Sequence, residues 1–184
     1  ANIELSLFGE TTDKDFKTLI DALEKENMKG MIIDLRNNPG GYLTTVISIL
    51  EHFIAQGNPI TGVSYPGNII AMTLSTGKGE LAEYPVVVLI NEGSASAAEI
   101  MAIALQEYGL APVIGTQSFG KGTVQQLLNY GDGSSFKVTI AKWLTANDMD
   151  IEKVGITPDI KIADDETTTL TDEVLEKGLQ EILN

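Results

Sequence analysis

Apolar residues along the first 115 positions follow two alternating patterns. Four segments are rich in apolar residues or alternate them with polar ones, and they are predicted as strands: 3–7, 31–35, 86–90 and 111–115. Three segments between them have apolar residues at helical spacing or high helix propensity, and they are predicted as helices: about 12–29, 43–55 and 95–108. Strands and helices that alternate in this way indicate an α/β fold, in which helices cover a sheet.

The pattern changes twice along the chain. Residues 57–84 hold five glycines and two prolines among short apolar runs, so they are predicted as a β excursion from the core. Beyond residue 123, antiparallel strands are predicted at 125–128, 135–140 and 141–144, with a turn at 131–133 and a last strand at 160–162. We therefore expect a core domain over 1–163, with a linker and an amphipathic helix (171–183) over 164–184.

Composition narrows the class of protein. The 184 residues include 26 acidic and 12 basic ones, for a formal net charge of −14. A phosphate-binding surface needs clustered cations, so nucleic acid is excluded as an expected partner. The chain has no cysteine and a single histidine, His52, which leaves little material for a thiolate site or a multi-histidine metal site.

The segment 86–105 carries the main candidate chemistry. An apolar strand is followed by a turn of Gly, Ser and Ala and then by an Ala-rich helix. Free N–H groups at the start of such a helix stabilise negative charge, so a serine there has an oxyanion site in its own backbone. The alternative interpretation is that Ser94 or Ser96 only caps the helix.

Four blocks of sequence, in their order and spacing, resemble those of carboxyl-terminal processing proteases, the tail-specific serine peptidases. The blocks are Asp-Leu-Arg-Asn-Asn-Pro-Gly-Gly (34–41), Gly-Ser-Ala-Ser-Ala-Ala-Glu (93–99), Phe-Gly-Lys-Gly-Thr-Val-Gln (119–125) and Gly-Ile-Thr-Pro-Asp (155–159). The resemblance implies a ClpP/crotonase-like spiral β/α core with an additional antiparallel β region. It also implies a serine endopeptidase that cleaves near the C-terminus of protein substrates through a Ser-Lys dyad and an acyl-enzyme.

The resemblance also assigns roles to single residues. Ser96 is implied as the nucleophile, Lys121 as the general base and Gln125 as the residue that orients the lysine. The backbone N–H groups of Gly41 and Ala97 are implied as the oxyanion hole. Ser94 matches the family's other serine, which is not the nucleophile.

The residues themselves support a lysine as the base. A serine hydroxyl is a poor nucleophile without a base, and with one histidine in the chain a lysine is the obvious substitute. A lysine accepts a proton only in its neutral form, which burial favours. Gly120 and Gly122 flank Lys121 and allow backbone to approach it closely. Taken alone, Lys121 would be interpreted as an exposed loop lysine.

Three further residues are candidates for supporting the site. Gly40 sits in the turn that precedes the second helix and has a purely structural interpretation as well. Arg36, the only arginine, either binds a substrate carboxylate or bridges loops, and the structural role is favoured. Glu107 matches an acidic position of some family members, yet it is also an ordinary position near a helix end. His52 is interpreted as structural.

The chain departs from the family pattern in two places. Members usually carry a PDZ domain before the core, whereas this chain begins at what looks like the first core strand, so we expect an excised core or a member without that domain. Residues 145–151 replace a turn that commonly contains a Gly-Arg pair, which affects the expected turn geometry and not the dyad.

Other functions remain open from the sequence. One is a non-catalytic binding or scaffold module on the same fold, as in retinoid-binding relatives, and another is a crotonase-like acyl-thioester enzyme, which has no need for the Ser-Lys pair. The resemblance implies a protein or peptide substrate with a free C-terminus, allows a homo-oligomer and implies neither metal nor organic cofactor. It also implies an extracytoplasmic location, in the periplasm, the cell envelope or outside the cell.

Overall fold

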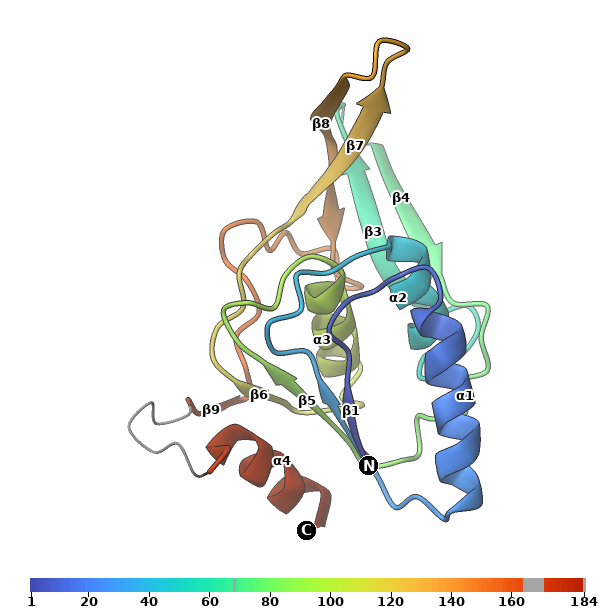
Figure 1. The fold of residues 1–184 in the computed structure, drawn as a ribbon, viewed down its shortest axis with the longest axis vertical. Coiled ribbons are helices and arrows are strands. Elements are labelled where there is room, and N and C mark those ends of the chain that lie inside the picture. The colour runs from blue at the N-terminus through green and yellow to red at the C-terminus, as the bar shows by residue number, and fades with distance from the viewer. Residues whose placement is uncertain (68, 164–170, 184) are drawn as a thin grey trace.

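Two sheets of different kinds make up the protein (Figure 1). The computed structural model describes residues 1–67, 69–163 and 171–183. A five-stranded parallel sheet has the order β1-β2-β5-β6-β9, and a four-stranded antiparallel sheet has the order β4-β3-β8-β7. Figure 1 shows the antiparallel strands extending away from the parallel sheet, with the β7–β8 hairpin reaching farthest. The fold is therefore mixed α/β, with parallel and antiparallel sheets.

The elements in chain order are β1 (Asn2–Glu4), α1 (Thr12–Lys25), β2 (Met31–Asp34), α2 (Leu43–Leu50), β3 (Pro59–Tyr65), β4 (Ile69–Leu74), β5 (Val86–Ile90), α3 (Ala97–Glu107), β6 (Val113–Gly115), β7 (Thr123–Asn129), β8 (Ser135–Leu144), β9 (Ile160–Lys161) and α4 (Glu173–Leu183).

Helices cover both faces of the parallel sheet, and the alternation of side chains along its strands divides the core between them. Ile33 and Val88 belong to the larger apolar cluster, which includes residues of α1, α2 and α3. Ile32 and Val87 point the other way and pack with Val174 of α4. Every residue of β2 and β5 is buried, so β5 is a continuous apolar run in the sequence and β2 is apolar up to its last residue, Asp34.

Several predicted elements are shorter in the structure, and two of them show why. The helix predicted over 43–55 ends at Leu50, because the N–H groups of His52 and Phe53 bond three residues back, to Ile49 at 3.1 Å and to Leu50 at 2.9 Å. The tighter turn still buries Phe53, which explains the apolar pattern beyond the helix. The strand predicted over 3–7 ends at Glu4, and Leu7 is 53% exposed.

The antiparallel region differs in one respect from the prediction. The strands predicted at 135–140 and 141–144 form a single strand, β8. Val124 pairs with Ala141 and the next residue, Gln125, pairs with Thr139, so Ile140 is an extra residue that forms a bulge. The bulge separates the buried base of β8 from its exposed arm.

The end of the chain carries the predicted helix as α4, while the predicted linker at 164–170 lies outside the described residues. None of the helices within the described ranges is long and apolar enough to cross a membrane.

Candidate active site

Ser96 occupies a sharp turn between β5 and α3. It is the N-cap residue of α3, and its backbone has φ 56° and ψ −116°, a left-handed conformation that β-carbon crowding disfavours. Such a conformation costs on the order of 1–3 kcal/mol, and it persists only where the surroundings hold it. Backbone strain is thus located at Ser96, the serine that the sequence analysis selects as the candidate nucleophile.

One pocket of about 290 Å³ brings the predicted site residues together. Ser96, Lys121, Gln125, Gly41 and Ala97 all line it, although they come from three separate segments of the chain. Among the described residues, no hydrogen bond joins the Ser96 hydroxyl to the Lys121 amine or to the Gln125 amide. Hydrogen bonds of a catalytic group are often long until substrate binds, so the arrangement remains suitable for a nucleophile and base.

Two backbone N–H groups at this pocket are free to bind an anion. Within the described part of the chain, neither the Gly41 N–H nor the Ala97 N–H donates a hydrogen bond. Ala97 is the first residue of α3, where the helix leaves its N–H groups unsatisfied and its dipole is positive. A negative oxygen beside Ser96 would therefore find two donors in place.

The loop that carries these glycines is fixed against the Ser96 turn. The buried Asn38 side chain accepts a hydrogen bond from the Gly40 N–H at 2.8 Å and donates one to the Leu5 carbonyl. The Asn38 carbonyl accepts the Ala95 N–H at 2.9 Å. A β-carbon on Gly40 would lie 2.8 Å from the β-carbon of Ser96, so only glycine fits this contact.

A buried carboxylate connects the serine turn to the lysine loop. The Glu99 side chain has no exposed surface. Its Oε2 accepts the N–H of Ser96 and the N–H of Lys121, both at 2.9 Å. Its Oε1 accepts the Ser118 hydroxyl at 2.6 Å and the Gly120 N–H at 2.7 Å. A single side chain thus positions the backbone of both residues of the candidate dyad.

The role of Glu99 was missed by reasoning from the sequence. The signal for half of it was present, because Ser-x-x-Glu at 96–99 is the pattern of a capping box at a helix start. The other half, the contacts with residues 118–121, depends on tertiary structure and has no local signal.

Lys121 is held from its carbonyl side as well. Its C=O accepts the indole N–H of Trp143 at 2.6 Å, and the N–H of Gly122 donates to Glu152 at 2.7 Å. A β-carbon on Gly122 would lie 2.8 Å from the backbone nitrogen of Glu152. The glycines beside Lys121 therefore allow the close backbone approach that the sequence predicts.

Ser94 lies in the same turn but is buried. Its hydroxyl donates to the Leu35 carbonyl at 2.8 Å and accepts the Asn91 N–H at 3.0 Å, and its side chain has no exposed surface. Ser94 thus joins the end of β2 to the turn and does not line the pocket of Ser96.

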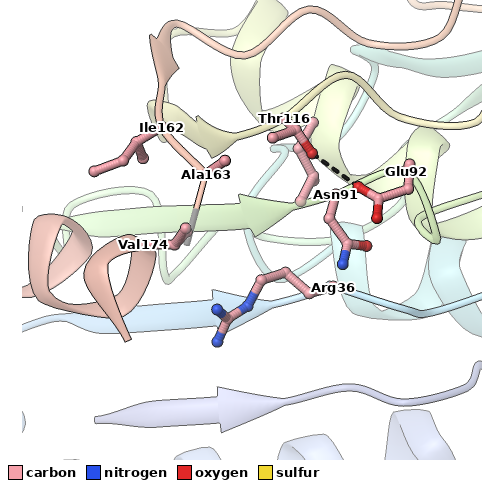
Figure 2. Close-up of a pocket in the computed structure, with 8 residues that line it drawn as sticks. Arg36, Asn91, Glu92, Thr116, Ile162, Ala163 and Val174 are labelled. Carbon is pink, nitrogen blue, oxygen red and sulfur yellow. Dashed lines mark hydrogen bonds between the residues drawn. The ribbon is translucent and has the colours of Figure 1, made fainter. Parts of the chain in front are cut away.

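Arg36 lines a different pocket, which lies between the ends of β2, β5 and β6 and α4 (Figure 2). Its guanidinium bonds Asp34 at 2.6 Å and Asp172 at 2.7 Å, which ties β2 to the start of α4. The hydrogen bonds that Arg36 donates to Asp34, and then to Asp172, raise the pKa of Arg36 above its usual range. In Figure 2, Thr116 and Glu92 are hydrogen-bonded to each other across this second pocket.

Glu107 and His52 also lie away from the Ser96 pocket. Glu107 ends α3, eleven residues from Ser96, or roughly 16 Å along the helix. It accepts the Asn147 N–H at 3.2 Å and so holds the loop 145–151. The His52 ring contacts the Glu80 carboxylate at 2.6 Å. Among the described residues, no group of three or more His, Asp or Glu side chains is placed to hold a metal ion.

Comparison with known proteins places the chain among peptidases. The sequence model of peptidase family S41 matches residues 1–162. The carboxy-terminal processing protease CtpA of Bacillus subtilis (strain 168) is 47% identical over 159 residues, which is 86% of this chain and 34% of that protein. The chloroplastic carboxyl-terminal-processing peptidase 3 of Arabidopsis thaliana is 35% identical over 182 residues, or 95% of this chain and 34% of that protein.

A solved structure agrees with the sequence relatives. The photosystem II D1 C-terminal processing protease has a TM-score of 0.76 and 28% identity, covering 87% of this chain and 41% of that one. The chain spans about a third of the length of the two curated relatives named above.

Proposed function

Since the chain belongs to peptidase family S41, we propose that it is the core of a serine endopeptidase that cleaves protein substrates near their C-termini. The observation that carries the proposal is the pocket at the start of α3, where Ser96, Lys121 and two free backbone N–H groups meet. We further infer that the two sheets belong to the spiral β/α arrangement of ClpP and crotonases, for which the parallel order β1-β2-β5-β6-β9 is the support.

In the proposed reaction the Ser96 hydroxyl attacks the scissile carbonyl carbon while the neutral Lys121 amine takes its proton. The C–N bond then breaks, the lysine returns the proton to the leaving amine, and the substrate's acyl group stays on Ser96 as an ester. Water attacks this ester with Lys121 again as the base, which releases the acid and restores the serine.

The negative oxygen formed in each attack is stabilised by the N–H groups of Gly41 and Ala97 in this proposal. A fixed donor of this kind contributes about 2.7–4 kcal/mol to lowering the barrier. Gln125 lines the same pocket, and its uncharged amide orients the lysine without adding a charge. Glu99 acts as a positioning residue through its bonds to Ser96 and Lys121.

The substrate, the location and the cofactor requirement belong to the same proposal. We propose a protein or peptide with a free C-terminus as the substrate and an extracytoplasmic location. We propose no requirement for a cofactor, because the serine and lysine supply the chemistry. The names of the relatives, which include carboxy-terminal processing proteases of bacteria and of a chloroplast, support this proposal.

Hydrolysis of an unstructured peptide by two matched serine variants tests the proposal. Ser96→Ala should abolish cleavage, whereas Ser94→Ala should retain a measurable part of it, because Ser94 forms structural bonds outside the pocket. Circular dichroism checks that both variants are folded. Equal loss of cleavage in two folded variants would refute the choice of nucleophile.

A further inference from the structure

The pocket of Ser96 is cationic in a protein that is strongly acidic. Lys121 and Lys137 both line it, and no Asp or Glu side chain is among its lining residues in the described chain. The whole sequence has 26 acidic and 12 basic residues. A cleft lined by one sign of charge concentrates the field and attracts groups of the opposite sign. The pocket is therefore suited to an anionic ligand group.

The Lys137 ammonium is not paired with any residue that the structure describes. It lies on β8 opposite Leu127 of β7, and the neighbouring pair on the same face is Thr139 with Gln125. All three neighbours are uncharged, and Lys137 makes no hydrogen bond or ion pair with any residue that the structure describes. Lys142, on the same strand, is by contrast paired with Asp150 at 2.6 Å.

The other lysine of the pocket has a different task. In the proposed reaction Lys121 must be neutral to accept a proton, so the fixed positive charge of the pocket is that of Lys137. The remaining lining includes apolar side chains: Leu43, Ile100, Val124 and Trp143. An apolar wall beside one free ammonium fits a peptide segment that carries an apolar residue and a carboxylate.

We propose that Lys137 is a specificity-determining residue that binds a carboxylate of the peptide substrate a few residues from the scissile bond. This inference rests on the proposed function. The carboxylate is either the C-terminus of the substrate or the side chain of an Asp or Glu. Lys137 stands two residues beyond Thr139, about 7 Å along the strand from Gln125, so it reaches a part of the substrate that the dyad does not touch.

A set of matched peptides separates the two sources of the carboxylate. The members of one pair differ only in having a free or an amidated C-terminus. The members of a second pair are both amidated and differ only in Asp or Asn a few residues from the cleavage site. Binding is measured by fluorescence anisotropy with the Ser96→Ala variant, and kcat/KM is measured with intact Ser96. Each measurement is made with Lys137, Lys137→Met and Lys137→Arg, and with the control Lys161→Met, which removes the same charge from an exposed residue of β9 outside the pocket.

We expect at least one carboxylate peptide to be preferred over its neutral partner by about fivefold, the scale of a partly exposed ion pair. Lys137→Met should abolish this preference, and Lys137→Arg and Lys161→Met should keep it. The preference should shrink as salt is raised, because exposed charges are screened. A preference that survives in Lys137→Met, or an equal loss with charged and neutral peptides, would overturn the proposal.

The two measurements also keep this inference apart from the proposed function. Carboxylate-dependent binding without cleavage in the intact protein would refute the peptidase proposal and leave the role of Lys137 standing. Cleavage without any carboxylate preference would do the reverse.

Discussion

Replacing Glu99 with glutamine perturbs the candidate site at one buried point. The carboxylate accepts four hydrogen bonds, two on each oxygen: from the N–H groups of Ser96 and Lys121 on one, and from the Ser118 hydroxyl and Gly120 N–H on the other. All four partners are donors, so an ionised carboxylate satisfies every one of them. The variant Glu99→Gln keeps the size of the side chain and removes its symmetry.

The expected loss of stability follows from the number of donors that a glutamine leaves without an acceptor. A glutamine amide has one acceptor oxygen, and its nitrogen cannot accept, so two of the four bonds are lost. A hydrogen bond to a charged group contributes about 1.5–3 kcal/mol, which predicts a loss of about 3–6 kcal/mol in the free energy of unfolding. A domain has about 5–15 kcal/mol in total, so the variant should lose a large share of its stability.

Two measurements check this prediction. Urea unfolding followed by circular dichroism gives the stability, and the rate at which a fluorophosphonate labels Ser96 in the absence of urea gives the geometry of the site. Glu152→Gln is the control, because the Glu152 carboxylate accepts a hydrogen bond from the Gly122 N–H, and this variant should lose only about 1.5 kcal/mol or less. The assigned role of this carboxylate would be refuted if the free energy of unfolding of Glu99→Gln lay within about 1 kcal/mol of that of the unmodified protein and Ser96 were labelled at the same rate in both.

Three further outcomes are expected. Lys121→Arg and Lys121→Ala should lose peptide hydrolysis to a similar degree, because a guanidinium stays protonated near neutral pH, and substantial activity of the arginine variant would exclude the lysine as base. Gly41→Ala should lower kcat by about 100-fold or more, since its φ is +142° and the added carbon would clash with the Phe8 carbonyl oxygen. Gly57→Ala, with φ +87° and open space around it, controls for backbone strain, and equal effects of the two variants on kcat would count against the oxyanion hole. Asp172→Asn should raise amide hydrogen exchange in α4 more than in α3, because it removes a charge from the bond to Arg36. Asparagine can still accept the Leu175 N–H at the start of α4, and an equal rise of exchange in both helices would contradict this expectation.

The parallel half of the fold was the more predictable part. Buried strands such as β2 and β5 consist of runs that are wholly or almost wholly apolar, and the helices of this half have their own periodicity, so local sequence identifies both. The end of α2 was not predictable in the same way. Phe53 is buried beyond that helix by a tighter turn, and burial alone does not distinguish a turn from a further helical turn.

The long antiparallel strand shows a second limit. Ile140 is an extra residue in β8, and a bulge has no signal in the apolar pattern except a change of phase, which reads as a break between two strands. The same holds for Lys137, which sequence reasoning did not select. Lys137 reaches the pocket only because the β7–β8 pairing places it opposite Leu127, on the same face of the sheet as Gln125.

Residues of the candidate site could be selected from the sequence for a different reason. Ser96 and Lys121 lie in Gly-rich blocks whose order and spacing are specific, and the structure places both at one pocket. The contacts that hold them were not predictable, because Glu99 and Trp143 act from positions whose chemistry is ordinary for a helix and a strand.

The site of covalent modification by a fluorophosphonate, located by intact mass and peptide mapping, tests the Ser-Lys dyad itself. A dyad of Ser96 and Lys121 predicts a single adduct on Ser96, absent in Ser96→Ala, retained in Ser94→Ala and strongly slowed in Lys121→Ala. An adduct on Ser94 or on a serine outside the pocket, or labelling of Ser96 that does not depend on Lys121, would contradict the Ser-Lys account.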